Sequence, residues 1–441
     1  MLLQIIAFIG WLVLAIWLIG RISTFKNSAF KKQTLWAFLL LKIAAGAALI
    51  WIYSSIYPNR QTADIFKFYD DALVINESLT EHPAAYFRLM SGIDDSASIC
   101  LPYLERMHNW APQSERWLEY AQTRNYNYFL SNRLITRIHV FLLPLSRGEI
   151  YTHLIFFNFI SLLSMVFFLN AFKVQNALPA LVFVLLPSTL LWCSGLLKDS
   201  IVLSALCFIL GGWENYKARK SRLASILLIL LCILAVLYTK FYILAGLAAY
   251  LGFELLLLLL PKVKASLLAF GIVGIACGFA ASGAGKPVLD VLCGKREEAL
   301  KAAVFGEAQN QVFYNPVDAD FRHVMHELPA ALWNAFFSPM PNAVGQNVLV
   351  LLASVENTFL LLILLTFVVK GRSFFRRRNS FSWVFFLLSL AFIIGFTSPV
   401  TGGLVRYKTA FISFAVLLWL NHLPLNWRGL RLLMKNRGDY P

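Results

Sequence analysis

The chain has little charge for its length. Of its 441 residues, 14% are Asp, Glu, Lys or Arg, whereas 59% are hydrophobic. Soluble globular domains carry about 25% charged and about 45–50% apolar residues. This composition argues against a soluble protein and favours one that has lipid as its solvent.

Several catalytic signatures are also missing. The sequence has no GxSxG, Walker A or GxGxxG motif, which leaves serine hydrolases, P-loop ATPases and dinucleotide-binding folds without support. The six cysteines form no CxxC pair, and no HExxH motif occurs, so a zinc site is not expected. The sequence requires no cofactor, and a divalent metal ion held by carboxylates stays open as an alternative.

What the chain does have is a series of long apolar runs. A hydrocarbon core needs about 20 apolar residues per helix, and fewer where a helix is kinked or buried among others. We therefore predict an all-α, polytopic transmembrane helical bundle of about eleven spans. These are expected at residues 1–20, 34–57, 150–172, 177–195, 199–213, 223–239, 241–260, 265–283, 346–369, 381–398 and 403–420.

The first of these runs could also be a signal peptide. Residues 1–20 are uncharged and end at Arg21, which makes the run longer than the apolar region of a signal peptide. No basic segment precedes it, and no small-residue cleavage site follows. We therefore interpret it as the first spanning helix.

The loops between the runs alternate in charge. One set holds twenty Lys and Arg residues with only two acids, Glu214 and Asp439. The positive-inside rule predicts that this set is cytoplasmic, with the amino terminus periplasmic and the carboxyl terminus cytoplasmic. The basic residues behind the net charge of +16 then lie next to anionic lipid headgroups. Because the membrane accounts for this charge, nucleic acid is not an expected partner.

Two long loops fall on the opposite, periplasmic side of a single integral membrane domain that covers residues 1–441. They are residues 58–149 and 284–345, and both are rich in aromatic and charged residues. In the first, Arg133 and Arg137 lie four residues apart among apolar residues, which is typical of a helix along the membrane interface. Both arginines are also candidates for substrate binding. Cys100 and Cys293 fall in different loops of this set, and a disulfide between them is one hypothesis.

The first group of candidate catalytic residues opens the first long loop. The segment TADIFKFYDDA contains Asp64, Asp70 and Asp71 just after the second predicted span. A carboxylate at the mouth of the bilayer could act as a general base towards a hydroxyl, or could hold a divalent ion against a phosphate. The alternative is a solvated helix start whose acids favour the helix dipole.

Two further groups are candidates for substrate binding. In LPSTLLWCSGLLKDSIVL, an apolar run is broken by Pro187 and Gly195 and then turns at Lys198 and Asp199. A break at membrane depth is tolerated where protein protects the backbone, and ionisable groups there are functional candidates. The alternative is a tight outer hairpin with an interfacial Lys–Asp pair.

The second of these groups is SPVTGGLVRYK. It places Arg406 and Lys408 after paired glycines at the head of the last span, where they could bind an anionic headgroup or a pyrophosphate. Ordinary snorkelling of the two side chains to the interface is the alternative. Lys42 and Lys240 are weaker candidates, and Glu356 is expected to have a buried partner.

Taken together, the order of these features resembles the GT-C superfamily of membrane glycosyltransferases. The stretches ADIFKFYDDA, YNYFLSNRLITRIHVFLLPLSRGEIYTHLIFFNFISLL and LPSTLLWCSGLLKDS are also similar to uncharacterised membrane proteins of Bacteroidetes-type bacteria. The resemblance implies a polyprenyl-phosphate-linked sugar as donor, a lipid or glycan acceptor in the periplasm, and the bacterial inner membrane as location. It implies Asp64 as the essential carboxylate, with Asp70 or Asp71 as substitutes. The chain departs from the family in having an additional early helix and no DxD pair.

From these features we expect a membrane glycosyltransferase. Two alternatives stay open: an O-antigen-type polysaccharide polymerase or ligase, and a transporter or flippase. The first shares many spans and arginine-rich outer loops. The second would be expected to show two related halves, which the sequence does not reveal.

Overall fold

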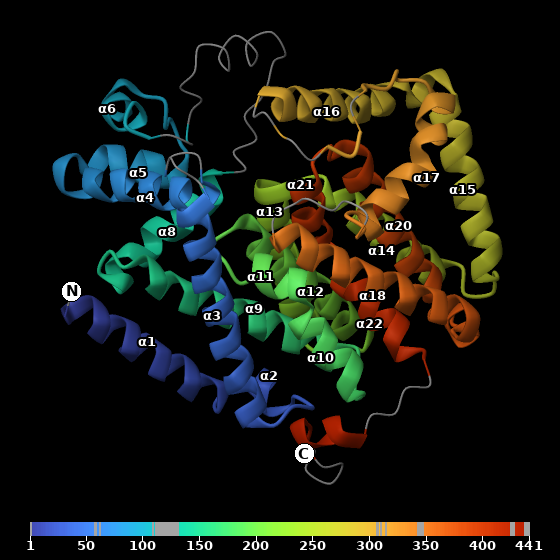
Figure 1. Ribbon diagram of the computed structural model, residues 1–441, viewed down its shortest axis with the longest axis horizontal. Helices are drawn as coiled ribbons and strands as arrows, with labels where there is room; N and C mark the ends of the chain where they lie inside the picture. Colours follow the sequence, from blue (N-terminus) through green and yellow to red (C-terminus); the bar gives the residue numbers. More distant parts are fainter. Residues whose placement is uncertain are drawn as a thin grey trace. The chain divides into compact units, whose positions relative to one another are not determined.

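The structure is a computed structural model of the chain. It describes residues 2–56, 60, 63–107, 110, 132–305, 308, 311–313, 315–341, 348–423 and 428–435. All regular elements within these ranges are helices (Figure 1), which confirms the predicted all-α fold class. Two isolated bridges, between Phe30 and Met434 and between Gln311 and Val400, add no sheet.

Six helices are long and apolar enough to cross a membrane, and the number rises to eight if each of two bent helix pairs forms one span. The six are α1 (Leu2–Ile19), α3 (Lys32–Ile56), α9 (Ile150–Ala171), α13 (Arg222–Lys240), α18 (Val348–Lys370) and α20 (Ser380–Thr397). The chain is therefore a helical, multi-pass membrane protein.

Eight of the predicted spans thus coincide with long or bent apolar helices, and three fall on other elements. The run 177–195 is divided between α10 (Ala177–Leu185) and α11 (Pro187–Trp192), because Leu186 precedes a proline and is extended at ψ 124°. The run 241–260 is the 17-residue helix α14 (Ile243–Leu259), and 199–213 lies within α12 (Lys198–Lys217). A total of eleven spans stays a prediction.

By its internal contacts the chain divides into two compact units. A single integral membrane domain over residues 1–441 stays a prediction. Unit 1 comprises residues 1–175, 190–241 and 431–441, and unit 2 comprises 176–189 and 242–430. The remaining helices of unit 1 are α2 (Ser23–Lys26), α4 (Asp64–Glu81), α5 (Pro83–Ser91), η2 (Ser98–Cys100), α6 (Leu101–Leu104) and α8 (Arg133–Ser146). Those of unit 2 are α15 (Ala265–Ala281), η3 (Gly283–Gly285), α16 (Lys286–Phe305), α17 (Phe321–Phe337), α19 (Arg372–Phe375), α21 (Thr401–Tyr407), η4 (Lys408–Ala410) and α22 (Ile412–Asn421), and η5 (Arg428–Leu433) crosses the boundary between the units.

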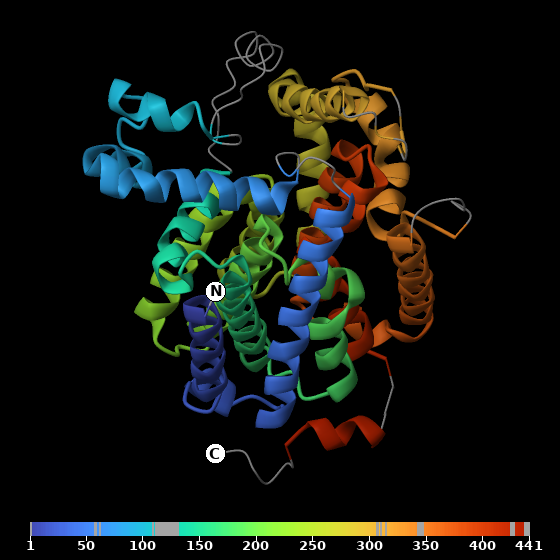
Figure 2. The same ribbon diagram turned by 60° about the vertical axis from the view of Figure 1, so that its left-hand side comes forward.

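Unit 1 is built around α12, which packs against α9 on one side and α13 on another. After α3, the chain turns, and α4 runs across the direction of α3 (Figures 1 and 2). The apolar face of α4, which includes Tyr69, Ala72 and Ile75, packs with α5, α6 and α8 in a buried cluster. The first long loop is thus mostly helical where it is described, and its helix α8 packs against α9, α13 and α1 of the same unit.

Unit 2 has α20 at its centre, in contact with α14, α16 and α17. A second group of contacts joins α10 and α18 to α22. The helices of the second long loop, α16 and α17, contribute Leu289, Cys293 and Val324 to a buried cluster with Phe396 of α20. Apolar burial therefore attaches this loop to a spanning helix, as it does in unit 1.

Candidate functional site

Two of the predicted acids lie on the face of α4 that meets Lys198. Asp64, Phe68 and Asp71 are spaced by four and three residues and therefore share one side of the helix. Phe68 lies between the two acids along this side of α4. The Nζ atom of Lys198 lies 5.5 Å from the centroid of the Phe68 ring. The structure thus brings Lys198 to the acid-bearing face of α4.

The two acids on this face differ in their access to water. The Asp64 side chain is 36% exposed, and its Oδ1 lies 3.8 Å from Nζ of Lys67 one turn later. Asp71 is buried, with 1% of the residue exposed. Asp64 is therefore the carboxylate of this pair that an incoming water-soluble group could reach.

Lys198 also contacts the residue that precedes α8. Its ammonium group donates a hydrogen bond to Oδ1 of Asn132, the N-cap residue of α8. Lys198 is the first residue of α12, so this one side chain joins the starts of α8 and α12 to α4. Asn132 and Phe68 were not among the predicted site residues.

Asp199 forms a buried ion pair with Lys240. Nζ of Lys240 lies 2.5 Å from Oδ1 of Asp199. Asp199 is in the first turn of α12 and Lys240 is the last residue of α13, and these two helices pack against each other. Burying one of these charges alone would carry a large desolvation penalty, which the second charge offsets. The weaker candidate Lys240 is thus the partner of a predicted one.

Asp70 points to a different environment. Arg60 donates two hydrogen bonds to its carboxylate, at 2.7 and 2.8 Å, and the guanidinium lies 4.2 Å from the centroid of the Phe66 ring. The hydrogen bond to Asp70 raises the pKa of Arg60 above its ordinary value. Arg60 is half exposed, and such a pair adds little to stability.

The predicted substrate-binding residues Arg133 and Arg137 make internal contacts. Their guanidinium groups lie 4.9 and 5.1 Å from the ring centroid of Trp110, and both lie near Oδ2 of Asp95, at 2.6 and 3.8 Å. Nε of Arg137 also donates to the carbonyl of Leu89. Burial lowers the pKa of both arginines. In this structure they attach α8 to the preceding part of the first long loop, and a role in binding substrate stays a prediction.

The last pair of predicted residues belongs to unit 2. Arg406 is half-buried in α21, and Lys408 is fully buried and donates to Oδ1 of Asn357. Nδ2 of Asn357 in turn donates to the carbonyl of Pro339. Next to it in sequence, Glu356 accepts hydrogen bonds from the backbone N–H and the hydroxyl of Ser188, at 2.7 and 2.6 Å. The expected buried partner of Glu356 is thus confirmed.

The predicted break between Pro187 and Gly195 is protected by protein, as expected for irregular backbone at membrane depth. Nδ2 of Asn158 donates to the carbonyl of Ser194 at 2.9 Å, and Nζ of Lys42 donates to the Ser194 hydroxyl at 3.1 Å. Lys42 is fully buried. The break therefore has its own polar partners from α3 and α9.

The hypothesis of a disulfide between Cys100 and Cys293 is wrong for this structure. Both thiols are free and buried. Sγ of Cys100 lies 4.0 Å from the carbonyl of Ala85, and Sγ of Cys293 lies 3.7 Å from that of Asp318. Each thiol packs as a small apolar group in the core of its own loop.

The site in unit 1 thus combines an accessible carboxylate, a cation positioned over an aromatic ring, and a buried ion pair behind it. Within the described ranges, no three His, Cys, Asp or Glu side chains are grouped so that they could hold a metal ion. Comparisons with protein families, with curated proteins and with solved structures give no match.

Proposed function

We propose that this chain is a membrane glycosyltransferase of GT-C-like architecture with about eleven spans. In this proposal it transfers a sugar from a polyprenyl-phosphate donor to a lipid or glycan acceptor on the periplasmic side of the bacterial inner membrane. The observation that carries the proposal is the position of Lys198 over Phe68, on the helix face that also bears Asp64 and Asp71. A base and a fixed positive charge on one face are what this reaction requires.

The reaction assigns one role to each charge. The acceptor hydroxyl attacks the anomeric carbon of the sugar while its proton passes to the Asp64 carboxylate. The bond between the anomeric carbon and the phosphate oxygen breaks, and the electron pair leaves with the polyprenyl phosphate. Lys198 stabilises the negative charge of that phosphate, because an ammonium group strengthens its interaction as charge develops on the leaving oxygen.

The buried ion pair acts as a positioning element in this proposal. Asp199 follows Lys198 directly, and its bond to Lys240 fixes the start of α12 against the end of α13. The hydrogen bond from Lys198 to Asn132 fixes the same point against α8. A cation held from two sides loses little additional freedom when it meets a phosphate.

The proposal is tested by Asp64→Asn in the bacterial host. The variant should insert and accumulate normally but lose an envelope glycan, and the polyprenyl-linked sugar donor should accumulate. Mass spectrometry of envelope glycans and of extracted lipids measures both. Asp94→Asn is the matched control, since Asp94 is an exposed loop acid paired with Arg88. Undiminished glycan in Asp64→Asn would exclude Asp64 as the base, and single repeat units left on lipid would indicate a polymerase instead.

One observation favours a transporter as a second candidate. Lys42 lies fully buried in a long apolar helix beside the broken segment at Ser194, and buried ionisable residues next to broken helices mark ion or substrate pathways in transporters. Two results together would support this candidate over the transferase. Proteoliposomes with the unaltered protein would take up a solute that those with Lys42→Met do not, and the envelope glycan would be intact in the Lys42→Met strain.

A further inference from the structure

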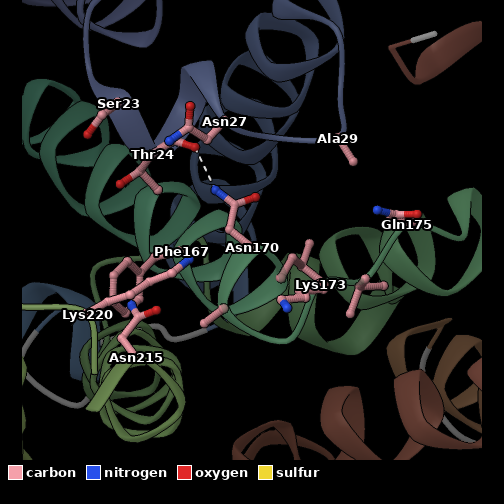
Figure 3. A pocket seen from close by; sticks show the side chains of 13 residues that line it. Ser23, Thr24, Asn27, Ala29, Phe167, Asn170, Lys173, Gln175, Asn215 and Lys220 are labelled. Atoms are coloured by element: carbon pink, nitrogen blue, oxygen red, sulfur yellow. Dashed lines mark hydrogen bonds between the residues drawn. The ribbon is translucent and has the colours of Figure 1, made fainter. Parts of the chain in front are cut away.

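A polar pocket lies at the far end of α12 from Lys198. It has a volume of about 330 Å³ and is formed where α9 and α12 end, next to α2 (Figure 3). Its lining residues are Ser23, Thr24, Asn27, Ala29, Phe167, Leu169, Asn170, Ala171, Lys173, Val174, Gln175, Asn215 and Lys220. None of these is acidic, and the proposed glycosyl transfer uses none of them.

With α12 as a spanning helix, as the sequence predicts, the pocket lies at the level where lipid headgroups are expected. From Lys198 to Asn215 along α12 is about 26 Å at 1.5 Å per residue, and a hydrocarbon core is about 30 Å thick. The neighbouring helix α9 is one of the six long apolar helices and ends at Ala171, at the pocket. Basic pockets between spanning helices are sites at which anionic headgroups bind.

The two walls of the pocket are the same structural motif. After α9, the N–H of Lys173 bonds to the carbonyl of Asn170 and that of Val174 to Leu169. After α12, the N–H of Arg219 bonds to Tyr216 and that of Lys220 to Asn215. Both are Schellman motifs, in which the first residue beyond the cap is left-handed and is usually glycine.

In both motifs a basic residue occupies the left-handed position. Lys173 has φ 53° and Arg219 has φ 61°, conformations that glycine adopts more readily than any residue with a Cβ atom. Compensation of the α12 dipole does not require Arg219, since Lys217 already provides a cation within the last turn of that helix, whereas α9 has no basic residue in its last turn. Lys173 thus combines an unfavourable backbone conformation with a side chain that lines the pocket.

The remaining polar groups complete a site for a phosphate ester. Nδ2 of Asn170 donates to the carbonyl of Thr24 at 2.8 Å, which attaches α2 to the end of α9 (Figure 3). Asn27, Asn215 and Gln175 add amide groups, and Lys173 and Lys220 add two cations. Ammonium groups bind phosphate through charge-assisted hydrogen bonds, and amides can bind the hydroxyl groups of a glycerol-type headgroup.

We propose that this pocket binds a phosphate ester, supplied by the headgroup of an anionic lipid or by a soluble molecule of the same chemistry. Lys173 and Lys220 hold the phosphate, and the amide side chains orient the hydroxyl-bearing part. The site is independent of the proposed glycosyl transfer, because it lies at the opposite end of α12.

The test uses the purified full chain in nanodiscs of phosphatidylcholine, with phosphatidylglycerol as the lipid probe and glycerol 1-phosphate as the soluble probe. Lys173→Gly and Lys220→Gln should each weaken binding of the effective probe about tenfold, as expected for loss of a charge-assisted hydrogen bond. Lys173→Gly should be at least as thermally stable as the unaltered protein without probe, because glycine suits the left-handed position.

Arg219→Gly is the matched control. It removes an exposed cation from the same position of the neighbouring motif, outside the pocket lining, and should leave binding unchanged. Lysine-dependent binding of phosphatidylglycerol assigns the site to a lipid, and lysine-dependent binding of glycerol 1-phosphate assigns it to a soluble ligand. The proposal is overturned if both lysine variants bind the probes as the unaltered protein does, or if Arg219→Gly weakens binding as much as they do.

Discussion

Nζ of Lys240 lies 2.5 Å from Oδ1 of Asp199, and the two side chains are 9% and 2% exposed. Replacing only Lys240 with methionine would leave a buried carboxylate without its ammonium partner. We expect Lys240→Met to lower the free energy of unfolding by about 3–5 kcal/mol. Unfolding titrations of the purified protein in detergent would measure this loss.

The corresponding double variant is the control for that prediction. In Lys240→Met combined with Asp199→Leu both charges are replaced by apolar groups, and we expect most of the stability to return. If the double variant were as unstable as the sum of the two single variants, the ion pair would have no coupling energy, and its assignment as a positioning element would fail.

A second prediction concerns the close approach of α3 to the broken segment. A Cβ atom at Gly46 would lie 2.3 Å from the backbone oxygen of Ser194 and 2.7 Å from Cδ2 of Leu154. Because a backbone oxygen cannot move aside cheaply, we expect Gly46→Ala to cost about 1–3 kcal/mol of stability. Thermal unfolding in detergent would show this as a lower midpoint. Gly10→Ala, where nothing lies within 4 Å, should not lower it.

The apolar runs allowed the helical architecture to be predicted because lipid requires long stretches of similar composition. Such runs do not show where a helix bends. The pair α15 and α16 is bent by 85° around Gly283, and α21 and α22 are bent by 59° near Phe411. The charge pattern of the loops favours an orientation with the amino terminus periplasmic, which stays a prediction.

The sequence analysis predicted several residues of the candidate site, but not which of them contact one another. Asp199 and Lys240 are 41 residues apart, and only the packing of α12 against α13 brings them together. Their pairing could nevertheless have been predicted, since Asp199 lies at the start of one helix and Lys240 at the end of the next, which is the same end of two consecutive antiparallel helices. The contacts of Arg133 with Asp95 and Trp110 could not have been predicted, because they depend on how the earlier part of the first long loop packs against α8.

A third prediction concerns Glu356, whose carboxylate accepts two hydrogen bonds from Ser188. Ser188→Ala removes the hydroxyl donor and leaves one lone pair of a buried carboxylate less well solvated. We expect a loss of about 1–3 kcal/mol in the free energy of unfolding. Ser54→Ala removes a comparable hydroxyl from an exposed position, where it bonds to Trp51, and should change stability by less than about 0.5 kcal/mol.

The same site allows the charge to be tested separately. In a Ser188→Ala background, Glu356→Gln removes the negative charge while keeping the side-chain length. We expect the second substitution to cost less in this background than in the unaltered protein, because the hydroxyl that bonds to this carboxylate is already gone. Equal costs in both backgrounds would show that the two side chains are not coupled.

A buried pair of histidines in unit 1 carries the last prediction. Nδ1 of His139 lies 2.8 Å from Nδ1 of His153, whose Nε2 lies 2.9 Å from the Ser146 hydroxyl. The Ser146 hydroxyl donates its own proton to the carbonyl of Leu143, so Nε2–H of His153 donates to Ser146. His153 Nδ1 must then accept from Nδ1–H of His139. This assignment follows from the hydrogen-bond network and makes the His153 ring neutral. Nε2 of His139 is buried without a hydrogen-bond partner, and a proton on it would be left unpaired, which favours a neutral ring there as well.

Acid should therefore destabilise unit 1 through this pair. Burial, and secondarily the neighbouring His153, lower the pKa of His139 well below its ordinary value of 6.5. Below pH 6.5 the unfolded chain takes up a proton at His139 that the folded chain does not, so the free energy of unfolding falls as the pH falls. Above pH 6.5 His139 is neutral in both the folded and the unfolded chain, so none of this stability is lost there. Unfolding titrations at pH 7.5 and pH 5.0 would measure the difference.

His139→Gln isolates this effect, because its amide can still donate to His153 but does not titrate in this range. The variant should lose less stability than the unaltered protein between the two pH values. His82→Gln removes an exposed imidazole from the start of α5 and should leave the loss unchanged. If His139→Gln retained the full acid loss, groups other than His139 would be responsible for it, and the predicted contribution of His139 would be wrong.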